Sequence, residues 1–142
     1  FALDGREYYL TQFVEYAQNG IYAKYRLVVV DGEIFLRHVM FSRMWMVHNK
    51  TQDKENTLRQ KISKSFIREI KPFIQPIISQ IYERLGLDYF GIDCNIDKDM
   101  NLLVFEINPN MNIFIETKGV FESHIEKARQ KLIHMLASSK DK

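Results

Sequence analysis

Two carboxylates and a carboxamide, Asp93, Glu106 and Asn108, occupy two apolar segments that are separated by a short polar link. Residues 87–96 and 102–110 are rich in apolar, β-branched and aromatic side chains, which favour strands, and the polar link between them suits a hairpin loop. The pattern therefore predicts a β-hairpin that carries the three polar side chains.

The register of this hairpin decides whether the three side chains meet. A four-residue loop places Asp97 opposite Leu102 and Asp93 opposite Glu106, and alternation puts Asn108 on the same face. Opposed side chains have Cβ atoms about 5 Å apart, so two facing carboxylates repel each other. Mg²⁺ removes this repulsion, because it binds one or two carboxylates together with phosphates and waters. The set is thus either a magnesium site or, in a shifted register, a solvated polar face.

Alternation also assigns the neighbouring side chains to faces. The apolar face of the first strand contains Phe90, Ile92, Cys94 and Ile96, so we expect the single cysteine in the core. On the second strand, Leu102, Val104, Glu106 and Asn108 share one face, and Leu103, Phe105 and Ile107 share the other.

The hairpin resembles the magnesium hairpin of the ATP-grasp superfamily, which includes glutathione synthetase and D-alanine–D-alanine ligase. The matching motifs are Gly91-Ile92-Asp93 and Phe105-Glu106-Ile107-Asn108-Pro109-Asn110. Residues 22–32 resemble the family's segment in which an arginine begins a hairpin, and residues 41–48 resemble a signature of a bacterial glutathione-synthetase-like branch. The resemblance extends from about Tyr8 to Met135.

The resemblance implies an α+β fold, in which an antiparallel sheet of hairpins packs against two to three helices, as in the C-terminal subdomain of an ATP-grasp domain. Residues 1–142 would form one domain, a fragment of a longer protein. The implied reaction is ATP-dependent ligation of a carboxylate to an amine or similar nucleophile through an acyl phosphate. Asp93, Glu106 and Asn108 would bind Mg²⁺ or Mn²⁺; Lys24, Arg26 and Arg37 would bind ATP, and Arg26 would be catalytic.

The sequence departs from the family in three respects. The strand lysine, glycine-rich loop and adenine pocket of the other subdomain are not visible, so we expect no catalysis without the missing N-terminal part as a partner. Gly91 stands where several relatives carry an arginine. Pro109, Asn110 and Met111 replace a small glycine-containing loop, which leaves open whether the substrate is a small-molecule or a peptide carboxylate.

Three strands and three helices are expected to position these residues. The strands are predicted at 7–16, 21–30 and 33–41, with a two-residue turn at Asp31-Gly32, and the helices at 58–70, 76–85 and 120–137. Pro72 should end or kink the first helix, and Gly86 should cap the second. On residues 33–41, strict alternation places Phe35, Arg37 and Val39 opposite Ile34, Leu36, His38 and Met40.

Composition excludes few classes of function. The 142 residues are 46% hydrophobic and 27% charged, and the net charge of +2 is too small to argue for nucleic-acid binding. No apolar run is long enough for a membrane span, and one cysteine fits the cytoplasm. The basic face around residues 58–71 is typical of a solvated helix. The alternative function is a non-catalytic binding module derived from an ATP-grasp fold, and a nucleic-acid binder is a third possibility.

Overall fold

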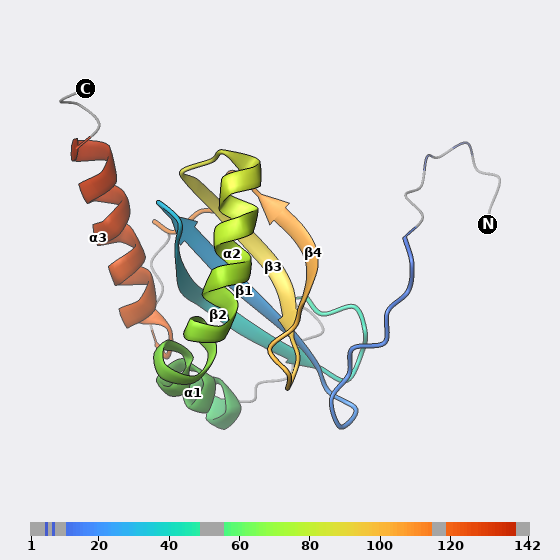
Figure 1. The fold of residues 1–142 in the computed structure, drawn as a ribbon. Helices are drawn as coiled ribbons and strands as arrows, with labels where there is room; N and C mark the ends of the chain where they lie inside the picture. Colours follow the sequence, from blue (N-terminus) through green and yellow to red (C-terminus); the bar gives the residue numbers. More distant parts are fainter. Residues whose placement is uncertain (1–4, 6, 8–10, 49–55, 115–118, 139–142) are drawn as a thin grey trace.

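The computed structural model describes residues 5, 7, 11–48, 56–114 and 119–138. Four antiparallel strands form one sheet in the order β2-β1-β3-β4 (Figure 1). Their bounds are β1 Tyr22–Val30, β2 Glu33–Ser42, β3 Tyr89–Ile96 and β4 Leu102–Asn108. The strands are two hairpins, β1–β2 and β3–β4, joined side by side through β1 and β3. Together with the helices, they confirm the expected α+β class.

The helical segments are α1 Asn56–Ser65, a π-helix Phe66–Ile70, α2 Lys71–Leu85 and α3 Glu122–Ser138. Pro72 was expected to end or kink the first helix, but α1 already ends at Ser65, before the π-helix. Pro72 lies in the first turn of α2, where a missing N–H is tolerated, and the wider π-helical turn before it makes the transition. This turn buries Phe66 and Ile70. Gly86 caps α2 in the left-handed conformation, as expected.

The two faces of the sheet carry separate hydrophobic clusters. One face packs against α1, the π-helix and α2, and its cluster contains the predicted row Phe90, Ile92, Cys94 and Ile96. The other face packs against α3 and the segment after β4, through side chains that include Val28, Phe35, Ile113 and Ile125. This second cluster uses only part of the face, so the part around Lys24 and Asp93 is left for polar side chains.

The β1–β2 turn has the predicted two-residue form. Asp31 and Gly32 both have positive φ, 50° and 73°, as a type I′ turn requires. Lys71 at the start of α2 binds Glu33 at 2.7 Å, and Lys131 of α3 binds Asp31 at 3.1 Å. Helices on both faces therefore hold this end of the sheet.

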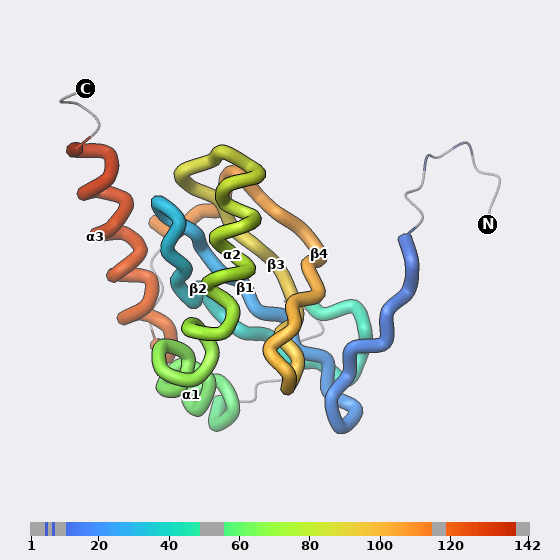
Figure 2. Tube along the Cα trace, in the orientation of Figure 1, coloured from blue at the N-terminus to red at the C-terminus, as the bar shows by residue number. Residues whose placement is uncertain are grey.

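The predicted strand at 7–16 was wrong for its described residues. Residue 7 and residues 11–16 belong to no strand, and the segment forms one isolated bridge further on, between Gln18 and Ile21. Figure 2 shows this segment descending beside the β3–β4 hairpin to the loop that enters β1. The expected loop at 49–56 lies outside the described residues, except for Asn56, which begins α1.

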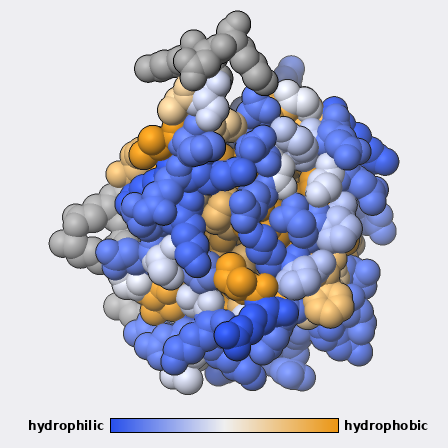
Figure 3. Space-filling model, turned by 60° about the vertical axis from the view of Figure 1, so that its left-hand side comes forward, coloured by the Kyte–Doolittle hydropathy of each residue, from blue (hydrophilic) through white to orange (hydrophobic). Residues whose placement is uncertain are grey.

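The surface on the α3 side is largely hydrophilic, with hydrophobic residues in small separate patches (Figure 3). Within the described residues, no helix combines the length and the apolar character that are needed to cross a membrane.

Candidate functional site

Four polar residues, one from each strand, form a continuous row across the sheet. Arg26 of β1 lies directly opposite His38 of β2 on one side and opposite Asp93 of β3 on the other. Asp93 in turn lies opposite Glu106 of β4. The predicted pairing of Asp93 with Glu106 is therefore confirmed. We call His38, Arg26, Asp93 and Glu106 the transverse row.

A β-bulge flanks the transverse row in each outer strand pair. On β2, Arg37 is the extra residue, because Leu27 pairs with Leu36 while Arg26 pairs with His38. On β4, Phe105 is the extra residue, next to the pairing of Asp93 with Glu106. Bulges of this kind redirect side chains and are frequent beside active sites.

The loop register and the faces of Leu102 and Leu103 differ from the prediction, because β4 contains a bulge. Leu102 pairs with Ile96 rather than with Asp97, so the pairing near the loop is one residue off the prediction, and the bulge restores the predicted register at Glu106. Leu102 consequently packs against the hydrophobic core, whereas Leu103 lines a cleft together with Asp93. Both side chains lie on the face opposite to the one predicted.

Asp93 is the centre of a charged cluster. Its side chain is 6% exposed, and its two carboxylate oxygens accept hydrogen bonds from Nε and Nη2 of Arg26, both at 2.7 Å. Lys24 Nζ lies 3.2 Å from Asp93 Oδ2. Burial alone would raise the pKa of Asp93, but the hydrogen bonds from Arg26 and the charges of Arg26 and Lys24 outweigh it, so the pKa is below its usual value.

The other two predicted metal ligands are more accessible than Asp93. Glu106 is exposed, and Asn108 is half-buried opposite Gly91. Asn108 Oδ1 accepts a hydrogen bond from the Asn110 backbone N–H at 2.8 Å, which leaves one lone pair of that oxygen available. The segment after β4 crosses Gly91 closely, because a Cβ at Gly91 would lie 2.7 Å from Met111 Cβ.

The donor set fits a magnesium–phosphate complex better than bare Mg²⁺. Searched over the described residues only, the structure holds no group of three or more His, Cys, Asp or Glu side chains that could bind a metal. The row offers two carboxylates, and the one on Asp93 is shared with two cations. Mg²⁺ is commonly held by one or two carboxylates when substrate phosphates complete its coordination.

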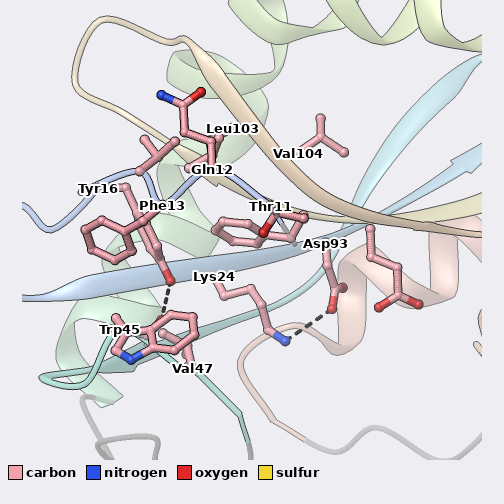
Figure 4. Close-up of a pocket in the computed structure, with 13 residues that line it drawn as sticks. Thr11, Gln12, Phe13, Tyr16, Lys24, Trp45, Val47, Asp93, Leu103 and Val104 are labelled. Carbon is pink, nitrogen blue, oxygen red and sulfur yellow. Dashed lines mark hydrogen bonds and ion pairs between the residues drawn. The ribbon is translucent and has the colours of Figure 1, made fainter. Parts of the chain in front are cut away.

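A cleft of about 530 Å³ opens beside the charged cluster (Figure 4). Lys24, Asp93 and Glu106 form its polar part, and its wall includes Phe13, Tyr16, Trp45 and Phe105. Figure 4 shows the rings of Phe13, Tyr16 and Trp45 on one side and the Lys24–Asp93 ion pair on the other. This volume lies in the usual range for small-molecule sites.

The aromatic wall is joined by specific contacts. The Tyr16 hydroxyl donates to the Trp45 carbonyl oxygen at 2.7 Å, and the rings of Phe13 and Trp45 meet edge to face with centroids 6.4 Å apart. Phe13 and Trp45 remain 64% and 56% exposed. None of these residues was among the predicted site residues: aromatic side chains in residues 11–16 favour a strand, and Trp45 entered only as part of the segment 41–48. A signal for them was present in the sequence, since Phe13 and Tyr16 lie among polar residues in a segment with only weak strand alternation.

Arg37, the remaining predicted nucleotide-binding residue, lies near Arg26 but does not line the cleft. Burial lowers the pKa of Arg37, and the positive charges of Arg26 and Arg129 lower it further. His38 is also constrained: burial, then the charges of Arg26, Arg37 and Arg59, lower its pKa to about 4. Within the part of the chain that the structure describes, His38 Nε2 has no hydrogen-bond partner.

No protein-family model matches this chain, and no curated protein matches it.

Proposed function

We propose that this chain is the magnesium- and ATP-binding half of an ATP-grasp ligase that joins a carboxylate to an amine or similar nucleophile. The observation that carries the proposal is the transverse row. Arg26 of β1, Asp93 of β3 and Glu106 of β4 lie in register, and Lys24 of β1 binds Asp93 from the same face. These are the residues that the resemblance to the ATP-grasp hairpin singles out.

The charges of the cluster support joint binding of metal and phosphate. Lys24 and Arg26 neutralise Asp93 in the structure, so bare Mg²⁺ would compete with two cations, and a bare phosphate would meet two carboxylates. A magnesium–triphosphate complex carries both signs of charge. Its metal can bind Asp93 and Glu106 while its phosphates bind Lys24 and Arg26. The metal then replaces the two cations as the partner of Asp93, and the phosphates replace Asp93 as the partner of the two cations.

Each residue then has a distinct task. The planar fork of Arg26 suits a phosphoryl group, and Lys24 supplies a point charge at the edge of the cleft. The remaining lone pair of Asn108 Oδ1 can complete the oxygen set. The aromatic wall gives the nucleoside an apolar surface. Bound magnesium–ATP would supply the phosphoryl group that activates the substrate carboxylate.

The test is a titration of Mg²⁺ together with a non-hydrolysable ATP analogue, followed by Trp45 fluorescence and melting temperature. We expect saturable binding, with much weaker responses to Mg²⁺ alone and to the analogue alone. Glu106→Gln should weaken joint binding by about tenfold or more, because interactions with charged groups contribute about 1.5–3 kcal/mol and 1.4 kcal/mol is a factor of ten.

Glu83→Gln is the matched control. It removes the same charge from an exposed position on α2, which covers the other face of the sheet, and should leave binding unchanged. Equal binding by Glu106→Gln and the wild-type chain would reject the metal role of the row. ATP turnover by this chain alone, abolished by Glu106→Ala, would show that it is a complete enzyme rather than half of one.

A second candidate function, a non-catalytic interaction module, is favoured by one observation. Phe13 and Trp45, whose rings are in contact, are more than half exposed, at 64% and 56%, as in a surface that binds another macromolecule. Such a module should tolerate Asp93→Asn without a change in its response to magnesium and nucleotide, whereas the ligase proposal predicts that this response is lost.

A further inference from the structure

Within the described part of the chain, Arg37 is a half-buried cation without a counter-ion. Across the described residues, no hydrogen bond or ion pair joins its guanidinium to another side chain or to the backbone. Its electrostatic neighbours include Arg26 and Arg129, which carry the same charge, and Tyr89, which is neutral at pH 7. An anion bound here would offset both the partial desolvation of Arg37 and its repulsion by the two arginines.

The β2 bulge places Arg37 close to Arg26. Arg37 is the extra residue of the β2 bulge, so it stands next to the pairing of His38 with Arg26. Two guanidinium groups from neighbouring strands therefore lie near each other, although only Arg26 has a carboxylate partner. Guanidinium forks are well suited to carboxylate and phosphate oxygens.

Arg37 lies outside the cleft. The cleft is lined by Lys24, Asp93 and Glu106, and not by Arg37. Arg37 instead lies towards α3, because Arg129 belongs to that helix and donates from Nε to the Ile113 carbonyl oxygen at 2.6 Å. Arg26 connects the two regions, because it binds Asp93 of the cleft and has Arg37 as an electrostatic neighbour.

We propose that Arg37, assisted by Arg26 and the positive charge of Arg129, forms a second anion subsite that binds a carboxylate or phosphate group of the substrate. Only the identity of the ligand rests on the proposed ligase function. In a ligase of this kind the occupant is an anionic group of the substrate other than the carboxylate that is activated. The substrate class is accordingly a dicarboxylate or a phosphorylated carboxylate, and the nucleotide phosphates bind on the Lys24 side of Arg26.

The test uses the whole chain without magnesium and without nucleotide, so it is independent of the proposed function. Inorganic phosphate, succinate and neutral succinamide are titrated at constant ionic strength, and the Nε–H resonance of Arg37 and the melting temperature are followed. We expect phosphate or succinate to shift the resonance and raise the melting temperature, and succinamide to do neither. A stronger response to phosphate indicates a phosphorylated substrate, and a stronger response to succinate indicates a dicarboxylate.

Three variants make the result specific. Arg37→Gln should weaken anion binding by about tenfold or more, as expected for the loss of a charge-assisted hydrogen bond. Arg37→Lys should retain part of the affinity, and Arg84→Gln, at an exposed site on α2, should retain all of it. In the absence of anions, Arg37→Gln should melt no lower than the wild type, because it removes a charge repelled by Arg26 and Arg129.

Two results would overturn the subsite. The first is equal anion affinity in Arg37→Gln and the wild type, or no response of the Arg37 resonance to either anion. The second is a loss of magnesium–nucleotide affinity in Arg37→Gln as large as its loss of anion affinity, which would place Arg37 in the nucleotide site. If magnesium–nucleotide binding fails while the anion response persists, the subsite stands without the proposed ligase function.

Discussion

Asp93→Asn is the substitution that most sharply probes the charged cluster. It keeps the size of the side chain, but it removes the charge that Arg26 binds through two hydrogen bonds of 2.7 Å and that Lys24 approaches to 3.2 Å. Lys24 and Arg26 would then lie beside a neutral amide. The NH₂ group of that amide would face the N–H donors of Lys24 and Arg26 and could not accept hydrogen bonds from them.

The expected loss of stability follows from burial. Breaking a fully buried ion pair costs about 3–5 kcal/mol. The Asp93 side chain is 6% exposed, but that of Arg26 is 37% exposed, so solvent screening reduces the cost to about 2 kcal/mol. For a chain of this length that corresponds to a decrease of roughly 5–8 °C in melting temperature. Chemical denaturation at pH 7 measures the free energy of unfolding directly.

The pH dependence of the free energy of unfolding tests the contribution of Asp93 independently. Because the folded state lowers the pKa of Asp93, its ionised form contributes stability above the ordinary aspartate pKa. That contribution is lost as pH falls through the lowered pKa. The difference between Asp93→Asn and the wild type should therefore be full at pH 7 and shrink steadily below about pH 4. A difference under about 0.5 kcal/mol at pH 7, the scatter of ordinary surface substitutions, would refute the reasoning.

Two further predictions concern neighbours of the cluster. His38 has a folded-state pKa of about 4, so as the pH falls the unfolded chain binds a proton at His38 before the folded chain does. The free energy of unfolding should therefore decline between about pH 6.5 and pH 4, by up to about 3 kcal/mol. His38→Gln should flatten that part of the stability curve. Gly91→Ala should destabilise the chain by about 1–3 kcal/mol, because its Cβ would overlap Met111. Met111→Ala should recover part of that loss, and equal stability of Gly91→Ala and the wild type would show that the crossing segment moves freely.

The sequence predicts the elements whose patterns are local. The Asp31-Gly32 turn, the apolar row on β3 and the glycine cap of α2 each depend on a few neighbouring residues, and the structure confirms them. The opposition of Asp93 and Glu106 was also predicted, although the loop register used to derive it was one residue off. The bulge at Phe105 compensates for that shift.

Bulges are the main reason that the remaining faces could not be predicted. Strict alternation fails after Arg37 and before Glu106, so Val39 joins the core cluster that contains Leu36, and Leu103 turns towards the cleft. A bulge depends on the fit between two strands rather than on a residue pattern within one. Residues 11–16 were misassigned for a related reason. Their aromatic side chains favour strands in general, but here they line the cleft without strand partners.

The position of the bound metal is the most direct test of the transverse row. Mn²⁺ replaces Mg²⁺ in the presence of the ATP analogue, and paramagnetic broadening of backbone amide resonances is mapped along the chain. We predict that broadening is strongest around Glu106, Asn108 and Asp93, and that Glu106→Gln greatly reduces it at Mn²⁺ concentrations near the dissociation constant of the wild-type chain. Broadening centred instead on the exposed turn that contains Asp97 and Asp99, or unaffected by Glu106→Gln, would contradict a metal site at the row.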